Sequence, residues 1–293
     1  MKPVERTVRI AGVAFGLRLG CPVFQRELER ILEPFPSRPG ASPGRQHYEV
    51  EHNGDYVLRK GRRVLFRCRD LDDALEYLEA DLYGQLIRLL EGRLLFHAGG
   101  VLRHGTLILL PAPPRSGKTT LVAGLVKRGC RYVTDELLIL EPRALRVRPL
   151  PKPLNLKHGS LTLFPRLAPQ LRPARPGPLK CPRQRIHHLL VHPRYRARGW
   201  IAPRRVVVLF PAYRARATAC LKALHRAEAV RRLAAASYNH FRFGTSFLPL
   251  LERLTRGALC AELSYGELQQ ALALIDHQVV ALRPAVRFPA SRA

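Results

Sequence analysis

The sequence has few acidic residues, few aromatic residues and no long apolar segment. Its 293 residues contain 22 Asp and Glu against 50 Lys and Arg, which gives a formal net charge of +28. So basic a chain is expected to attract polyanions, acidic peptides or membrane surfaces. No run of about 18 apolar residues occurs, and residues 1–12 lack the apolar core of a signal peptide. We therefore expect no membrane span and a cytoplasmic location.

The shortage of aromatic residues and the scatter of the basic ones argue against a nucleic-acid reader. Aromatic residues make up only 7% of the chain, which leaves little material for stacking on bases. The arginines are spread along the whole sequence, and no helix-turn-helix, zinc-finger or RNA-recognition signature occurs. Specific nucleic-acid recognition is therefore not expected. A general compositional bias toward arginine and alanine is the alternative explanation of the charge.

The cysteines and histidines do not form metal-binding patterns. The chain has six cysteines and no C-x-x-C pair, which argues against a zinc ribbon or a thioredoxin-like site. The cysteines are expected to be small, reduced core residues: Cys21, Cys68, Cys130, Cys181, Cys220 and Cys260. Four histidines also lack metal-ligand spacing on any predicted element: His187, His188, His225 and His240.

The most informative stretch is residues 94–140. An apolar strand is predicted over residues 105–110, followed by a proline-rich turn, the sequence Ser-Gly-Lys-Thr-Thr and an apolar-periodic helix over residues 121–127. A phosphate-binding loop has this order because the N-terminus of a helix presents unpaired N–H groups and a positive dipole end. The predicted nucleotide-binding residues are Pro114, Arg115, Ser116, Gly117, Lys118, Thr119 and Thr120. Lys118 would reach the β- and γ-phosphates, and the Thr119 hydroxyl would hold Mg²⁺.

The loop departs from the usual pattern, G-x-x-x-x-G-K-[ST]. Ala112 stands where the first glycine is expected, and Pro113 and Pro114 follow it. Because proline has no N–H, fewer backbone donors face the phosphates than in a glycine-rich loop. The alternative interpretation is a plain turn before a core helix.

Two adjacent acids follow in the next strand. A short strand is predicted from residue 132, after the helix stop at Gly129, with Asp135 and Glu136 near its C-terminal end. Ligands of open α/β sheets bind at that edge. A carboxylate there can order Mg²⁺ or accept a proton from an attacking hydroxyl, so both acids are assigned as catalytic residues and, with Thr119, as metal ligands. A solvated turn is the alternative.

Five short blocks follow one another in order between residues 94 and 160. They are His97-Ala98-Gly99-Gly100, residues 110–118, residues 125–129, Thr134-Asp135-Glu136 and residues 153–157. This order resembles the catalytic core of HPr kinase/phosphorylase, and more closely the HPr-kinase-related kinases of bacterial peptide-modification clusters, often termed HprK-related kinase A. Arg115 departs from that group, in which a glycine usually stands there.

The resemblance implies a P-loop kinase core of the HPr kinase/PEP carboxykinase type that uses ATP and Mg²⁺. The implied reaction is phosphorylation of a hydroxyl, serine first, on a peptide or small protein. It also places His97 near the active site, against the γ-phosphate or the catalytic acid, with a structural histidine as the alternative. Expected partners are an acidic peptide or small protein, a PqqD-like peptide chaperone and a second copy of the chain. Alternative functions are a nucleotide-binding regulator or scaffold without turnover, and a basic nucleic-acid-binding protein.

The remaining patterns predict an α/β fold with two domains, a small N-terminal α/β domain over residues 1–85 and the catalytic domain over residues 86–293. The first should contain a strand over residues 7–15, a helix over 22–32 that buries Val23, a loop over 34–43 and a three-stranded meander. The spacing of apolar residues predicts a helix over 71–90, begun by Asp70.

The C-terminal half is expected to surround a buried strand over residues 206–210. Helices are predicted over 228–236, 249–254 and 265–275, with a strand over 258–263. Lys152 and Lys157 are candidate cations for a nucleotide or a substrate phosphate. Residues 164–199 are rich in proline and arginine and predict a long basic loop, of which 172–198 would recruit an acidic partner.

Overall fold

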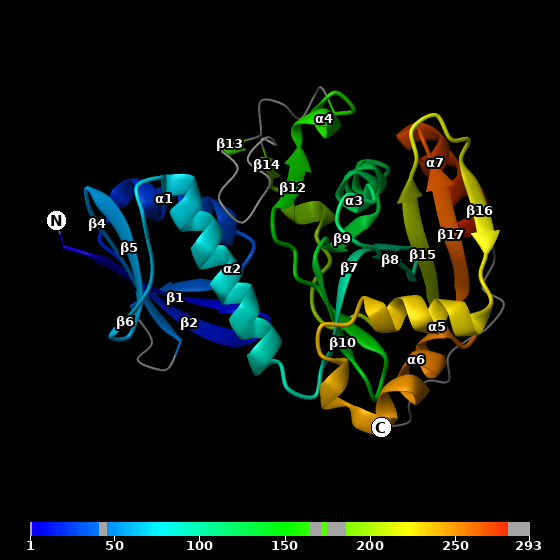
Figure 1. Ribbon diagram of the computed structural model, residues 1–293, viewed down its shortest axis with the longest axis horizontal. Helices are drawn as coiled ribbons and strands as arrows, with labels where there is room; N and C mark the ends of the chain where they lie inside the picture. The colour runs from blue at the N-terminus through cyan, green and yellow to red at the C-terminus, as the bar shows by residue number, and fades with distance from the viewer. Residues whose placement is uncertain (1, 41–45, 165–171, 175–185, 281–293) are drawn as a thin grey trace. The chain divides into compact units, whose positions relative to one another are not determined.

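The computed structural model describes residues 2–40, 46–164, 172–174 and 186–280 (Figure 1). The chain has mixed α/β structure, and this part of the predicted fold is confirmed. Its contacts divide it into two compact units, Met1–Glu91 with Lys152–Leu190, and Gly92–Pro151 with Val191–Ala293. The first break falls at residue 91, where the sequence predicted 85. Residues 152–190 interrupt the second unit in sequence but belong to the first by their contacts.

The first unit contains a six-stranded sheet in the order β3-β1-β2-β4-β5-β6, with two helices. Its elements are β1 (Val4–Ile10), β2 (Val13–Leu19), α1 (Pro22–Leu32), β3 (Ser37–Pro39), β4 (His47–Asn53), β5 (Asp55–Lys60), β6 (Arg63–Cys68) and α2 (Leu71–Leu89). A small three-stranded sheet and a short helix also belong to it: β12 (Leu154–Lys157), α4 (His158–Leu161), β13 (Arg172–Ala174) and β14 (Ile186–Leu189). Half of the predicted basic loop, residues 165–171 and 175–185, lies outside the described residues, and the described part contains β13, β14 and a short 3₁₀ turn where the sequence predicted only loop.

Three predictions for this unit were wrong. The single strand expected over residues 7–15 is a hairpin, because Ala11 and Gly12 adopt positive φ angles of 47° and 89° and let Ile10 pair with Val13. Within the expected loop, Ser37–Pro39 pairs with β1 as β3. On α1 the buried residue is Phe24, and Val23 is 45% exposed.

Helix α2 is the predicted amphipathic helix. It begins where Asp70 accepts hydrogen bonds from the amides of Asp72 and Asp73, at 2.8 and 3.3 Å, a side-chain N-cap. Of the apolar residues whose spacing predicted the helix, those at 74, 75, 78, 82, 86 and 90 are buried, whereas Leu89 is 40% exposed. No helix of the described part of the chain is long and apolar enough to cross a membrane.

The second unit is built on an eight-stranded mixed sheet in the order β11-β10-β7-β8-β15-β17-β16, with β9 beside β7. The strands are β7 (Leu94–Arg103), β8 (Thr106–Pro111), β9 (Arg131–Thr134), β10 (Leu137–Glu141), β11 (Arg146–Arg148), β15 (Arg205–Tyr213), β16 (Cys220–Ala223) and β17 (Leu259–Tyr265). The α-helices are α3 (Lys118–Lys127), α5 (Arg226–Ala235), α6 (Phe247–Thr255) and α7 (Leu268–Ile275). Short 3₁₀ turns lie at Pro193–Tyr195, His240–Arg242 and Gly244–Ser246, and a π-helical turn at Asp276–Val280.

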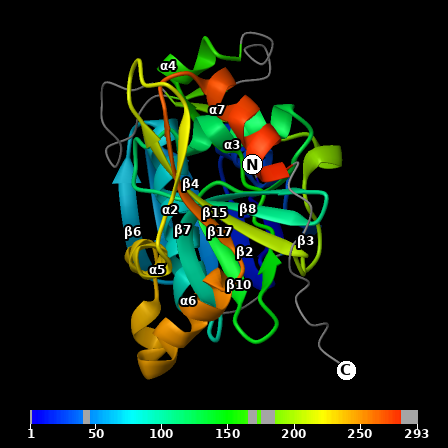
Figure 2. The ribbon, with the colours of Figure 1, turned by 90° about the vertical axis from the view of Figure 1, so that its right-hand side faces the viewer.

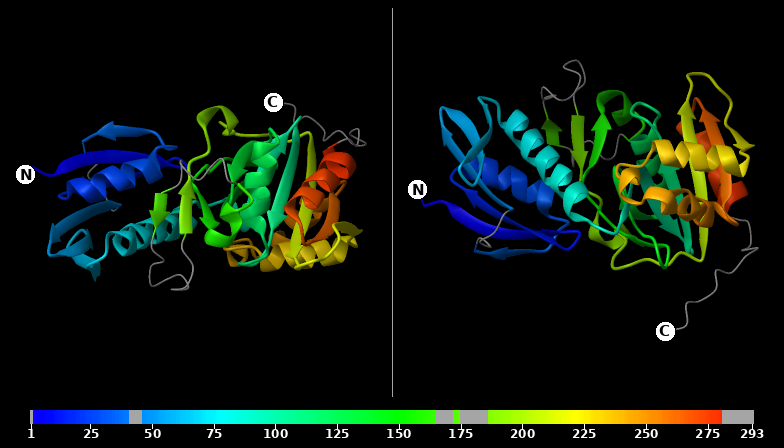
Figure 3. Two further views of the ribbon diagram at one scale, coloured as in Figure 1. Left: turned by 90° about the horizontal axis from the view of Figure 1, so that it is seen from above. Right: turned by 60° about the horizontal axis from the view of Figure 1, so that its bottom comes forward.

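Helices cover both faces of this sheet. Leu94, Phe96 and Ala98 of β7 point into a core that also holds Leu233 of α5 and Leu251 of α6. Helices α3 and α7 lie on the opposite side, as Figure 2 shows, and the right panel of Figure 3 brings α5 and α6 forward. Because side chains along each strand point alternately to the two faces, the sheet packs against an apolar layer on each side.

The centre of the sheet is parallel. Strand β15 runs parallel to β8 on one side and to β17 on the other, so their C-terminal ends meet at one edge. Tyr265 is the last residue of β17, opposite Tyr213 of β15. The prediction that Tyr265 begins a helix was wrong, because α7 begins at Leu268.

Candidate functional site

The loop between β8 and α3 lies at this C-terminal edge. Strand β8 ends at Pro111, and α3 begins at Lys118, three residues earlier than the sequence predicted. The helical hydrogen-bond ladder starts where the Leu121 amide donates to the Gly117 carbonyl, at 3.0 Å. Amides in the first turn of a helix cannot join that ladder and carry the positive end of the helix dipole. The loop therefore leads into a helix end suited to an anion.

Gly117 occupies a position that requires glycine. Its φ is 84°, in the left-handed region, and a Cβ at this residue would lie 2.2 Å from the Tyr265 hydroxyl oxygen. That hydroxyl donates a hydrogen bond of 3.2 Å to the Gly117 carbonyl. Burial raises the pKa of Tyr265, which keeps its hydroxyl protonated as a donor. Close contact with the end of β17 thus fixes the turn that precedes α3.

Arg115 has a left-handed backbone, with φ of 70°, and its side chain is exposed. The strain of this conformation is about 1–2 kcal/mol for a residue with a Cβ and is absent for glycine. The preference for glycine at this position, implied by the resemblance, therefore has a backbone cause. In this chain the arginine follows the backbone path that glycine favours.

Lys118 and His97 are brought together. The Lys118 Nζ lies 2.7 Å from the His97 Nε2, and the lysine is only 7% exposed. A protonated Lys118 can only donate in this contact, so it requires the Nε2 of a neutral His97 as the acceptor. The His97 amide donates to the Ala236 carbonyl at the end of α5, at 2.7 Å. The histidine is thus held by strand pairing on β7 and by α5.

Asp135 and Glu136 form the tight turn between β9 and β10. Both strands pair with β7, and the Glu136 carbonyl accepts the Ala98 amide at 3.2 Å. Ala98 lies opposite Pro111, the last residue of β8. The register therefore places the two acids beside His97 at the sheet edge that carries the loop. Asp135 is buried, with 5% of its surface exposed.

The remaining predicted loop residues differ in environment. Pro114 is exposed, whereas Thr119 and Thr120 are half-buried in the first turn of α3. The hydroxyl oxygen of Ser116 is buried and has no hydrogen-bond partner among the described residues. A buried hydroxyl usually requires such a partner. This donor fits a phosphate oxygen at the helix N-terminus.

The described residues contain no group of three or more His, Cys, Asp and Glu side chains that could hold a metal ion. Mg²⁺ in nucleotide sites binds one or two carboxylates together with phosphate oxygens and water, and therefore needs no such group. The donor set at this edge, the Thr119 hydroxyl with Asp135 and Glu136, consists of the oxygen ligands that Mg²⁺ prefers.

Three residues near the loop were not assigned a role from the sequence. Tyr265 closes against Gly117, and Tyr213, 52% exposed, packs edge-on against Tyr265 with ring centroids 5.8 Å apart. Gly99 of β7 faces α3, where a Cβ would lie 2.7 Å from the Val122 Cγ2 and 3.2 Å from the Lys118 Cγ. The parallel pairing of β8, β15 and β17 brings the tyrosines here, and neither tyrosine has a local pattern that would have assigned it to this loop.

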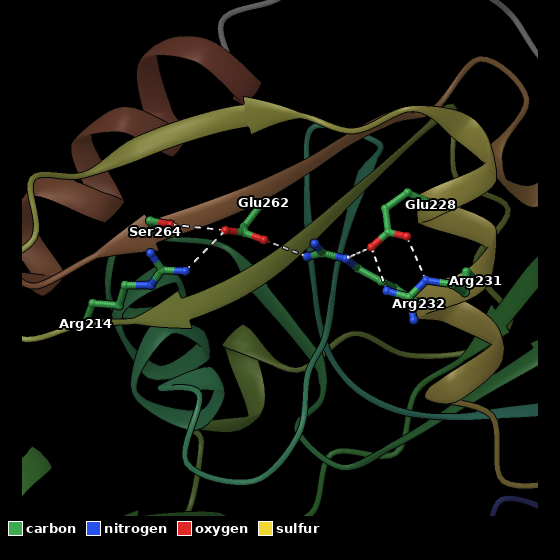
Figure 4. Close-up of polar contacts among 6 residues, drawn as sticks. All are labelled: Arg214, Glu228, Arg231, Arg232, Glu262 and Ser264. Carbon is green, nitrogen blue, oxygen red and sulfur yellow. Dashed lines mark hydrogen bonds and ion pairs between the residues drawn. The ribbon is translucent and has the colours of Figure 1, made fainter.

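An ion-pair network holds α5 to the sheet, as Figure 4 shows. Arg232 of α5 binds Glu228 on its own helix at 2.6 Å and Glu262 of β17 at 2.8 Å. Hydrogen bonds from Arg231 and Arg232 lower the pKa of Glu228 to about 2, and the hydrogen bond from Arg232 lowers the pKa of Glu262. Because Ala236, the residue after α5, accepts the His97 amide, this network links β17 to the site.

Lys152 was a candidate cation for the nucleotide. In the first unit its ammonium lies 3.4 Å from the Glu79 carboxylate and 5.1 Å from the centre of the Tyr83 ring, and the residue is buried. The Lys152 ammonium is thus paired with a carboxylate and an aromatic ring of the first unit.

No protein-family model matches the chain, and no curated protein matches it significantly.

Proposed function

We propose that the second unit is a P-loop phosphotransferase, which binds ATP with Mg²⁺ and phosphorylates a hydroxyl, serine first, of a peptide or small protein. The observation that carries the proposal is the buried Lys118 at the start of α3, 2.7 Å from His97, in a loop where the Ser116 hydroxyl has no partner among the described residues. The block order resembling HPr-kinase-related enzymes supports the choice of a peptide hydroxyl.

The binding roles follow from charge and position. The Lys118 ammonium and the amides at the start of α3 would bind the β- and γ-phosphate oxygens, and the Ser116 hydroxyl would donate to one of them. The Thr119 hydroxyl, Asp135 and Glu136 would hold Mg²⁺, which when bound neutralises charge on the phosphate oxygens. The left-handed Arg115 leaves the loop on a path compatible with this role.

The catalytic roles rest on His97 and the acids. The Asp135 carboxylate would accept the proton of the attacking hydroxyl. His97, through its Nε2, holds the Lys118 ammonium in place before nucleotide binds. Phosphoryl transfer depends mainly on such positioning of the reacting groups.

Equilibrium binding of Mg²⁺-ATP tests the first half of the proposal. We expect Lys118→Ala to weaken binding by about tenfold or more, because it removes a charged donor to the phosphates. Lys127→Ala, which removes the same charge at the other end of α3, should bind ATP like the wild type. An equal loss of ATP affinity in both variants would mean that only the overall positive charge matters. A wild type that does not bind ATP would overturn the proposal.

The second candidate function is that of a nucleotide-binding regulator. Tight ATP binding by the wild type without transfer to any peptide encoded beside its gene would favour the regulator over the kinase.

A further inference from the structure

Three arginines surround the only tryptophan of the chain. The guanidinium carbons of Arg93, Arg146 and Arg148 lie 5.1, 5.6 and 5.5 Å from the centre of the Trp200 ring. Each distance is within the range of cation–π attraction. We call this group, Arg93, Arg146, Arg148 and Trp200, the Trp200 patch. It lies within the second unit and shares no residue with the site at the loop.

Strand pairing builds the patch. Val147 of β11 is fully buried and pairs with Ile201, so Arg146 and Arg148 share the other face of the strand, and the antiparallel register sets Arg148 opposite Trp200. Across the sheet, Arg146 pairs with Glu141 of β10, and the next position along the β10–β7 register is Arg93. The patch is therefore fixed by backbone hydrogen bonds.

Positive charge in the patch exceeds its neutralisation. Glu141 lies 3.9 Å from Arg93 and 3.6 Å from Arg146, and its two oxygens also accept the amides of Arg143 and Ala144 at 3.1 Å. One carboxylate thus pairs with two of the three guanidinium groups. Arg148 forms no ion pair with any residue that the structure describes, and burial together with the nearby Arg93 lowers its pKa. An anion at this position would relieve that repulsion.

We infer that the Trp200 patch binds a carboxylate-rich segment of a polypeptide. A guanidinium group stacked on an aromatic ring keeps its N–H edge free to bind a carboxylate with two parallel hydrogen bonds. A nucleic-acid strand usually gains affinity by stacking its bases on exposed aromatic rings. Three guanidinium groups already occupy the surroundings of Trp200, which favours carboxylates over bases.

The patch and the site share one face of the sheet. Along β7 and the residue before it, Arg93, Leu95 and His97 alternate with Leu94 and Phe96, which point into the opposite core. Arg93 and His97 are four residue steps apart along an extended chain, a span of roughly 13 Å. A bound segment with a hydroxyl a few residues from its acids would match this spacing. Such delivery rests on the proposed function, whereas binding at the patch does not.

The test measures binding of a fluorescein-labelled hexaglutamate peptide by anisotropy in the absence of nucleotide, at about 0.1 M salt, where screening still permits attraction at short range. The emission of Trp200 reports where the peptide binds, because the chain has no other tryptophan. The test variant is Arg146→Ala/Arg148→Ala. The matched control is Arg62→Ala/Arg63→Ala, which removes the same charge from two exposed residues of the first unit.

We expect the peptide to change Trp200 emission and the test variant to lose about tenfold or more in affinity, while the control variant stays within about twofold of the wild type. Far-UV circular dichroism should show both variants folded. Equal affinity of the two variants, or unchanged Trp200 emission on peptide binding, would overturn the inference. A thymidine oligonucleotide that binds the patch more tightly than the peptide would overturn it in favour of nucleic acid. Failure of the wild type to bind ATP would overturn the proposed function but would not affect the inference about the Trp200 patch.

Discussion

Gly117 is the residue on which the geometry of the loop depends most. It combines a left-handed backbone with a close approach to the Tyr265 hydroxyl, to which its carbonyl is hydrogen-bonded at 3.2 Å. A side chain there meets two separate obstacles, backbone strain and steric overlap. Gly129, at the end of α3, has a φ of 92° but no atom within 4 Å of its would-be Cβ, so it presents only the first obstacle.

This difference predicts the relative cost of two alanine substitutions. Gly129→Ala should lower the free energy of unfolding by about 1–2 kcal/mol through backbone strain. Gly117→Ala should cost about 1–3 kcal/mol more, because its Cβ overlaps Tyr265. Urea denaturation of both variants measures the two values. Adding Tyr265→Phe to Gly117→Ala should recover part of the additional loss, and equal costs for the two alanine variants would contradict the steric explanation.

Residue types predicted part of the site and missed the rest for a physical reason. The loop residues and the two acids could be named from the sequence because each lies within a short pattern with a chemical meaning, whereas His97 was named only through the resemblance to HPr kinase. Tyr265 and Trp200 could not, because their roles arise only when strands far apart in the chain pair. The left-handed backbone of Arg115 was equally hidden, since arginine does not signal a positive φ.

Helix α5 connects β17, an inner strand of the sheet, to the site. Its ion pairs with β17 hold one side of the helix, and the residue after its end accepts the His97 amide. Loss of the charge of Glu228 or Glu262 should therefore lower the free energy of unfolding. It should also loosen α5 and so change the position of His97. The pKa values of both carboxyls are lowered in the folded state.

The lowered pKa of Glu228 predicts the direction of its pH dependence. Its pKa is about 2 in the folded protein against an ordinary value of 4.5, so its stabilisation is present above pH 4.5 and is lost as the pH falls toward 2. The difference in unfolding free energy between wild type and Glu228→Gln, measured in urea, should therefore shrink between about pH 6 and pH 3. Glu252→Gln, at an exposed glutamate of α6, serves as the control and should give no such trend. A constant difference for Glu228→Gln would contradict the assignment.

Elements were predictable where local chemistry decided them. The Asp70 cap and the apolar spacing of α2 specified its start and buried face, and the meander of β4, β5 and β6 followed from alternation and a turn at Asn53-Gly54. The β1–β2 hairpin was missed because Ala11 does not signal a turn. The α7 boundary was missed because Tyr265 and Leu268, three residues apart, fit one face of a helix, although Tyr265 ends β17.

At the scale of the whole molecule, two compact units share one chain. Segment 152–190 leaves the second unit after Pro151 and returns at Val191, while its own contacts lie in the first. All the loop, acid and histidine groups of the candidate site belong to the second unit. The formal net charge of +28 is a property of the entire chain, and the Trp200 patch is one place where its excess is concentrated.

The central claim is that this second unit transfers a phosphoryl group. The most direct measurement is transfer of label from γ-labelled ATP with Mg²⁺ to the peptides encoded beside the gene, by wild type and by Asp135→Asn. We expect transfer to a serine by the wild type. In the variant, ATP binding should be largely kept while transfer falls by about 10²-fold or more, the scale for a lost general base. Equal transfer by both proteins would contradict the role of Asp135, and ATP binding by the wild type without transfer to any of the peptides would contradict the claim itself.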